Sequence, residues 1–337
     1  MSVFRGLPLL AALLLLGGCD EAGKLFGGGG GKIASSTPAP GGDVDPALAS
    51  QVQRSADGVT FRRDLDYPSQ IDGRLNITRK FDNFRKVETS ALGKEISVLN
   101  HKIETEVTFV KEPGSYRMTL VKSSRRIIEE KDKEHLQQAP DATPNSAADV
   151  QGGRELEGES LEFLLTTDGW KPSSMGQEAN FKKVVWADAL KDQVAMMMVE
   201  SGAHPRVQWF SSSRKWKPGD RIVLTGSSVK VLDPYNVVGR VELVFEGEEA
   251  VGGHPCGVFS VVGELSLDDQ AGLDGRKVDS EITITQGRIW ASLLYPLLMR
   301  EEYESVQTVD SDGGSGPRAR MQGSVSEIRS RVWAPRE

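Results

Sequence analysis

Cysteine and histidine are scarce in this chain, and their scarcity excludes several kinds of site. The 337 residues include 2 cysteines and 4 histidines. The histidines are scattered, and none has the His-Glu-x-x-His spacing of a zinc enzyme. No Gly-x-Ser-x-Gly nucleophile turn is present either. The sequence therefore predicts no metal, no cofactor and no catalytic residue.

Positive charge is also in deficit. The chain has 41 Lys+Arg against 48 Asp+Glu, for a formal net charge of −7. A moderately acidic protein has no general electrostatic attraction to nucleic acid or to anionic lipid head groups. We therefore expect no nucleic-acid partner.

Long hydrophobic runs are missing as well. The run from Leu7 to Leu16 is shorter than the roughly 20 residues that a membrane span needs. It follows Arg5 and leads into Leu16-Gly17-Gly18-Cys19. Together these features resemble the signal peptide and lipobox of bacterial lipoproteins, whereas the alternative is an ordinary secreted protein with a chance cysteine.

The lipoprotein resemblance implies removal of residues 1–18 and a diacylglyceryl thioether on Cys19. Its expected partner is thus a membrane, contacted through lipid on Cys19, and its expected location is the bacterial cell envelope, facing the periplasm. Asp20 is similar to the inner-membrane retention signal of enteric lipoproteins. Residues 19–50 are rich in glycine, proline and serine, so we expect a flexible linker there.

The body is expected over 51–337. Asp45-Pro46 is typical of a helix start, and a short helix to about Arg54 is predicted. Beyond it, apolar and polar residues alternate with a period of two, as in half-buried antiparallel strands. The apolar members of these runs are Ile103, Thr105, Val107 and Phe109; Leu161, Phe163 and Leu165; Val241, Leu243 and Phe245; and Ile282 and Ile284.

One long amphipathic helix is predicted near 177–201, because its apolar residues recur at helical spacing. It divides the body into two halves, 51–176 and 203–337, in each of which an alternating strand leads into a glycine turn and a tryptophan. We therefore predict an α+β fold dominated by antiparallel sheet, curved or half-barrel in form. It is loosely similar to uncharacterised β-rich envelope lipoproteins and to the half-barrel lipid carriers of the envelope.

Cys256 lies in an expected strand, two residues after His254. A catalytic thiol needs a nearby base and an orienting third group, and no third group is evident. A buried, small, apolar role is the expectation for Cys256.

The functional hypothesis is a non-catalytic envelope lipoprotein that binds an apolar ligand or a partner protein. Apolar concavities with a few polar groups are the usual form of a ligand pocket. The alternatives are an envelope hydrolase with a dispersed active site, or a purely structural lipoprotein. The candidate ligand-binding residues are Trp186, Leu190, Val194, Met197, Trp209 and Trp290.

Overall fold

The computed structural model describes residues 38–62, 70–90, 93–131, 157–167, 169–173, 214–231, 237–271, 277–312 and 318–335. The lipobox and the helix predicted over 177–201 lie outside these ranges. Within them, no helix combines the length and apolar character that crossing a membrane requires.

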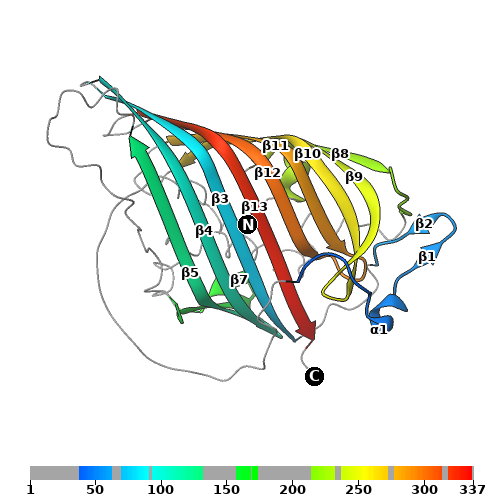
Figure 1. Ribbon diagram of the computed structural model, residues 1–337. Helices are drawn as coiled ribbons and strands as arrows, with labels where there is room; N and C mark the ends of the chain where they lie inside the picture. The colour runs from blue at the N-terminus through cyan, green and yellow to red at the C-terminus, as the bar shows by residue number, and fades with distance from the viewer. Residues whose placement is uncertain are drawn as a thin grey trace.

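One open antiparallel sheet of eleven strands dominates the described chain, as the sequence predicts (Figure 1). Its order is β7-β6-β5-β4-β3-β13-β12-β11-β10-β9-β8, and Figure 1 shows the strands sloping side by side across a curved surface. The strands are β3 (Ile71–Ser90), β4 (Gly93–Glu112), β5 (Ser115–Lys131), β6 (Ser160–Thr166), β7 (Gly169–Pro172), β8 (Arg221–Thr225), β9 (Val237–Val251), β10 (His254–Ala271), β11 (Lys277–Ser292), β12 (Leu298–Ser311) and β13 (Arg318–Pro335).

The pairing of β3 with β13 joins the two expected halves of the body. It runs from Ile71 opposite Pro335 to Thr89 opposite Arg318. Every other pairing in the large sheet joins strands that are consecutive in the sequence. Residues 51–176 and 203–337 therefore both contribute strands to a single sheet, with β13 at its centre.

Side chains alternate between the two faces of the sheet. We call the face that carries Val107 and Leu243 the inner face and the opposite one the outer face. The predicted apolar runs lie on the inner face and are buried or half-buried, with the exception of Leu165. Leu165 is 54% exposed because it pairs with the short edge strand β7 beside its turn.

Two apolar fields cover much of the inner face. The first field belongs to β3–β6 and contains Ile71, Leu75, Ile77, Val107, Phe109, Tyr116, Met118, Leu120, Leu161 and Phe163. The second field belongs to β8–β11 and contains Leu224, Val237, Val241, Leu243, Phe245, Phe259, Val261, Leu265, Leu267, Ile284, Ile289 and Ala291. Gly73 is required in the first field, since a Cβ there would lie 2.0 Å from the Phe109 ring.

The N-terminal described segment, 38–62, packs on the sheet, although residues up to 50 were expected to form a flexible linker. Gly41 and Asp45 donate backbone hydrogen bonds to Ala250 and Gly253 at the turn between β9 and β10. The helix does begin at Pro46, with Asp45 accepting a hydrogen bond from the Ala47 N–H. It is short, however, because α1 (Pro46–Ala49) ends before the strands β1 (Arg54–Ser55) and β2 (Gly58–Val59).

A tight aromatic contact fastens this segment to the second field. Phe61 stacks on Phe259 at 5.8 Å between ring centroids, and Trp216 meets Phe259 edge-on at 5.0 Å. Gly257 makes room for Phe61, since a Cβ at this position would lie 2.5 Å from the end of the phenyl ring. The remaining element, η5 (Gly226–Val231), is a 3-10 helix between β8 and β9.

Candidate functional site

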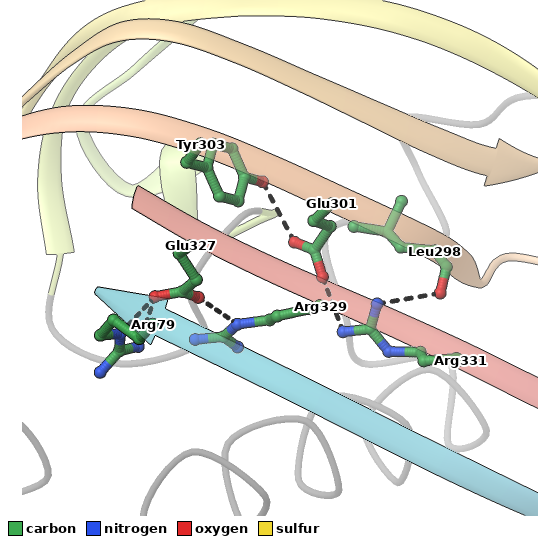
Figure 2. A network of polar contacts seen from close by, with 7 residues as sticks. All are labelled: Arg79, Leu298, Glu301, Tyr303, Glu327, Arg329 and Arg331. Atoms are coloured by element: carbon green, nitrogen blue, oxygen red, sulfur yellow. Dashed lines mark hydrogen bonds and ion pairs between the residues drawn. The ribbon is translucent and has the colours of Figure 1, made fainter. Parts of the chain in front are cut away.

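A row of charged side chains from β3, β13 and β12 lies on the inner face (Figure 2), and the two apolar fields lie to either side of it. Alternation along β13 puts Glu327, Arg329 and Arg331 on this face. Arg79 of β3 lies opposite Glu327, and Glu301 of β12 lies opposite Arg329. We call these five residues, together with Tyr303 of β12, the ridge.

Two arginines hold the carboxylate of Glu327. Arg79 Nε and Nη2 each lie 2.5 Å from Glu327 Oε2, and Arg329 Nε donates to Glu327 Oε1. Burial favours a raised pKa for Glu327, but the adjacent charges of Arg329 and Arg79 outweigh it and lower the pKa to about 2. Glu327 is therefore ionised at neutral pH.

The second carboxylate of the ridge, Glu301, is held from two sides. Arg331 Nη2 donates to Glu301 Oε2 at 2.6 Å, and the Tyr303 hydroxyl donates to Oε1 at 3.1 Å. Arg331 also donates to the carbonyl oxygen of Leu298 at 3.1 Å. Removing one partner of such a buried pair leaves an uncompensated charge, which typically costs about 3–5 kcal/mol.

Access to solvent differs along the ridge. The side chains of Glu301 and Arg331 are 3% and 5% exposed. Those of Arg79 and Arg329 keep 15% and 13% of their surface exposed. The Arg79–Glu327–Arg329 end is thus the part of the ridge that a small polar group can reach more easily.

The structure also brings together a serine and a histidine. His254 Nε2 and Ser292 Oγ are 2.7 Å apart, where the start of β10 meets the end of β11. The pair resembles the start of a nucleophile–base arrangement, so its chemistry bears on the hydrolase alternative. Ser292 is 1% exposed, and its Oγ accepts hydrogen bonds from the N–H groups of Leu294 and Tyr295.

An oxygen that accepts two backbone hydrogen bonds donates its own proton to the His254 ring. Both lone pairs of Ser292 Oγ are then engaged by backbone N–H groups, which leaves none for attack on a substrate. Burial lowers the pKa of His254 to about 4, so the imidazole is neutral at pH 7 and a weak base. The serine fixes the turn after β11, and the ring of His254 packs against Trp333 at 5.2 Å.

Cys256 is fully buried in β10, as the sequence predicts. Its Sγ contacts the carbonyl oxygen of His254 at 3.5 Å. Burial, reinforced by the charge of Glu249, raises the pKa of the Cys256 thiol well above its usual range. A thiol held in its neutral form is a poor nucleophile.

Of the six candidate ligand-binding residues, Trp290 alone lies within the described residues. It is 1% exposed and lies on the outer face, because Ile289 beside it points to the inner face. Its indole N–H donates to Glu249 at 2.9 Å, and it packs with Val251, Cys256, Val258 and Met299. The other five candidates and Cys19 lie outside the described ranges, so their roles stay predictions.

The ridge was missed in the sequence because its charges come from three strands, and β3 lies far along the chain from β12 and β13. The described residues contain no group of three or more His, Cys, Asp or Glu placed to hold a metal ion. What the arrangement offers is a buried apolar surface with ionised, hydrogen-bonded groups at its centre.

Comparison with known proteins assigns no family to the chain. No family model matches it, and no curated protein does. A solved structure of lipovitellin, from work on its lipid–protein interactions, is similar over 80% of this chain and 26% of its own, with 8% identity and a TM-score of 0.35. The chain therefore spans about a quarter of that protein's length, and a likeness at this level carries no argument about function.

Proposed function

We propose that this chain is a lipid-anchored protein of the bacterial envelope whose inner sheet face binds an apolar ligand. The observation that carries the proposal is the inner face itself. Two broad apolar fields lie on one sheet, and the ionised ridge runs between them. Apolar walls with a few placed polar groups are typical of small-molecule sites.

The driving force for such binding is removal of the ligand's own apolar surface from water, because the side chains of both fields are already buried. Burial contributes about 25 cal/mol per Å² of apolar area, and part of that gain is offset by ordering the ligand. A long acyl chain suits extended rows of Val, Leu and Phe side chains, because strands present these side chains at regular intervals on one face.

The proposal is non-catalytic. The Ser292–His254 pair is the arrangement that would favour the hydrolase alternative, and its hydrogen bonding and low histidine pKa argue against attack by Ser292. A partner protein remains the second candidate. Val223 and Val262, 45% and 47% exposed, lie on either side of Glu242 on the outer face, where a partner could contact them.

The anchor in this proposal is lipid on Cys19, with the body reached through residues 20–37. Their glycine-, proline- and serine-rich composition is typical of flexible linkers, and a linker of about 18 residues has an r.m.s. reach of roughly 25 Å. Pro38, the first described residue, accepts a hydrogen bond from Arg300 through its carbonyl oxygen near the start of β12. The proposal therefore places this end of the body within reach of the membrane.

Ligand extraction tests the proposed function. Full-length protein purified from its own membrane is extracted with organic solvent, and the extract is analysed by mass spectrometry. We expect one or a few apolar molecules in near-stoichiometric amount. We also expect the stripped protein to regain thermal stability when they are returned, since a ligand that binds only the folded state stabilises it. An empty extract, with no stabilisation by a panel of lipids, would leave the partner-binding or structural readings.

A further inference from the structure

We propose that the outer face of the sheet pairs with the outer face of a second copy of this chain, about a two-fold axis that runs along β13. This inference concerns the face opposite the proposed ligand site, and it does not depend on what binds there.

The outer face is accessible over much of its width. Five of its apolar side chains stay exposed: Val306 at 37%, Ile328 at 39%, Val238 at 44%, Val223 at 45% and Val262 at 47%. Single exposed apolar side chains are normal on a protein surface, so this exposure shows that a partner can reach the face without identifying the partner. The arrangement of charge on the face does identify one.

Charge differs between the two sides of β13. This strand is the sixth of eleven, with five strands on each side. On its outer face, Ser326 lies between Lys80 of β3 and Glu304 of β12, and both of these side chains are exposed. A rotation of 180° about β13 exchanges the two sides, so Lys80 of one copy faces Glu304 of the other. The same contact forms a second time, because a two-fold interface is self-complementary.

The neighbouring strands continue the match in this row. Lys80 pairs with Lys102 of β4, and Glu304 pairs with Gln286 of β11. The rotation therefore sets the two lysines against a carboxylate and a neutral amide. Within the chain, burial and the charge of Asp82 raise the pKa of Glu304, and the charge of Lys80 lowers it. A lysine from a second copy adds a further favourable charge beside this carboxylate.

The next row of the outer face matches as well. Ile328 lies on β13 between Thr78 and Glu302. Beyond them lie Glu104 on β4 and Arg288 on β11. The rotation sets Glu104 opposite Arg288 and packs Ile328 against its own copy. In neither row do like charges meet, and complementary charge of this kind fixes the register of an interface.

The direction of the axis follows from charge and from the anchor. An axis across the strands would set Lys80 and Lys102 against the same two lysines of the second copy, which is repulsive. An axis along β13 also keeps the two Pro38 residues, which lie beside Arg300 near the start of β12, at one end of the dimer. Two chains anchored in one membrane need this arrangement, and this step alone rests on the proposed anchor.

The available area suits a dimer. Because the sheet is curved (Figure 1), only the five central strands, β4, β3, β13, β12 and β11, are counted. At about 4.8 Å between strands and about 3.3 Å per residue, a stretch of about 11 residues on each presents roughly 900 Å². A specific interface of standard size buries about 800 Å² per partner.

A cross-link across the axis is the first test. Full-length protein carrying Ser326→Cys is treated with a short bismaleimide in detergent, at well under one chain per micelle. We expect a covalent dimer, because the two added thiols lie near the axis on sheets about 10 Å apart. The matched control is Val238→Cys on β9, which is 44% exposed and four strands from the axis. The rotation puts its two copies roughly 40 Å apart, so it should not cross-link.

Charge reversal tests the proposed contacts. Dimer affinity is measured by native mass spectrometry of the full-length wild type, Lys80→Glu and Glu304→Lys from the same detergent. Each variant should weaken the dimer at least tenfold, because like charges then face each other twice. Lys122→Glu reverses the charge of an exposed outer-face lysine on β5, away from the axis, and should change the affinity less than twofold. Thermal melting establishes that each variant is folded.

Mixing the two variants separates contacts between copies from effects within one chain. A Lys80→Glu chain that faces a Glu304→Lys chain restores both contacts with their charges exchanged. The mixture should therefore dimerise with the affinity of the wild type, although each variant alone does not. An affinity tag on one variant lets capture report the mixed dimers.

The outcomes decide the inference independently of the ligand. A wild type that stays monomeric over the micromolar range overturns it. So does a mixture of the two folded variants that fails to dimerise, or a Ser326→Cys chain that cross-links no faster than Val238→Cys. Ligand extraction tests the proposed function separately, so either proposal can fail without the other.

Discussion

Acidification should destabilise this protein through His254, and the structure gives the size of the effect. His254 is buried, and its pKa falls from 6.5 to about 4 on folding because burial disfavours the charged ring. Between these values the unfolded chain binds a proton that the folded chain does not bind. Stability therefore decreases as the pH falls from about 6.5 to about 4.

The full contribution of His254 to the free energy of unfolding is on the order of 3 kcal/mol, at 1.36 kcal/mol per pKa unit. About 2 kcal/mol of it is lost by pH 5. Glu327 acts in a different window. Its pKa of about 2 lies below the unfolded value of 4.5, so its contribution is present at neutral pH and is lost as the pH falls from about 4.5 toward 2. The two groups can be separated by measuring above pH 5.

Urea unfolding at pH 7.5 and pH 5 is the assay, with the full-length wild type beside His254→Gln. The glutamine keeps a polar group near Ser292 but does not titrate. The wild type should lose about 2 kcal/mol more than the variant on acidification. Equal losses in the two proteins would refute the reasoning, because the histidine would then not be the group that binds the extra proton.

Three further predictions concern packing and the anchor. Val241 lies on the inner face of β9 with 0% exposure, and Val241→Ala should destabilise the protein by about 2 kcal/mol through the loss of two buried methyl groups. Val238 on the same strand is 44% exposed, and Val238→Ala should cost less than ~0.5 kcal/mol. Urea unfolding measures both values. Similar values would contradict the face assignment. Gly257→Val should destabilise by about 1–3 kcal/mol, since its side chain would overlap the Phe61 ring, and recovery in the Gly257→Val, Phe61→Ala double variant would identify that contact as the cause. Cys19→Ser should abolish partition into detergent, and a variant that still fractionates with membranes would contradict lipidation at Cys19.

The strands of the inner face could be predicted because their periodicity is local. Runs such as Ile103 to Phe109 and Val241 to Phe245 indicate which side chains share a face of the sheet, and the structure confirms the assignment. The start of α1 was predictable too, since an Asp cap followed by Pro is a short-range signal. Its end was not, because Arg54, the expected last residue of the helix, pairs with Val59 in the two-stranded sheet β1–β2, and α1 ends at Ala49.

The ridge could not be predicted, because the alternation of charged and uncharged residues along β13 indicates that the charged ones lie on the exposed face. In Glu327-Ile328-Arg329-Ser330-Arg331 the charged residues look like the wet face. Yet Ile328 is 39% exposed and Arg331 is 4% exposed. Pairing with Arg79 and Glu301 on neighbouring strands makes burial of these charges tolerable, and only the sheet register supplies those partners.

Trp290 shows how one irregularity changes a face. Uninterrupted alternation along β11 would place it with Ile282 and Ile284 on the inner face. The register shift between Ile284 and Gln286 reverses the alternation, so Ile289 points inward and Trp290 outward. Gly287 beside the shift is the local signal, since an isolated glycine in a strand can mark a bulge, but it was interpreted as a turn and periodicity alone could not find the shift.

The most direct test of an apolar ligand on the inner face is to locate one there. Phospholipid with dibrominated acyl chains is bound to the delipidated protein, and the bromine positions are determined from anomalous diffraction of crystals of the complex. We predict bromine peaks beside the apolar fields, near Val107 and Phe109 or near Leu243 and Phe245. Bromine confined to the outer face, or a complex without ordered bromine and with an inner face filled by the protein's own side chains, would contradict the proposed function.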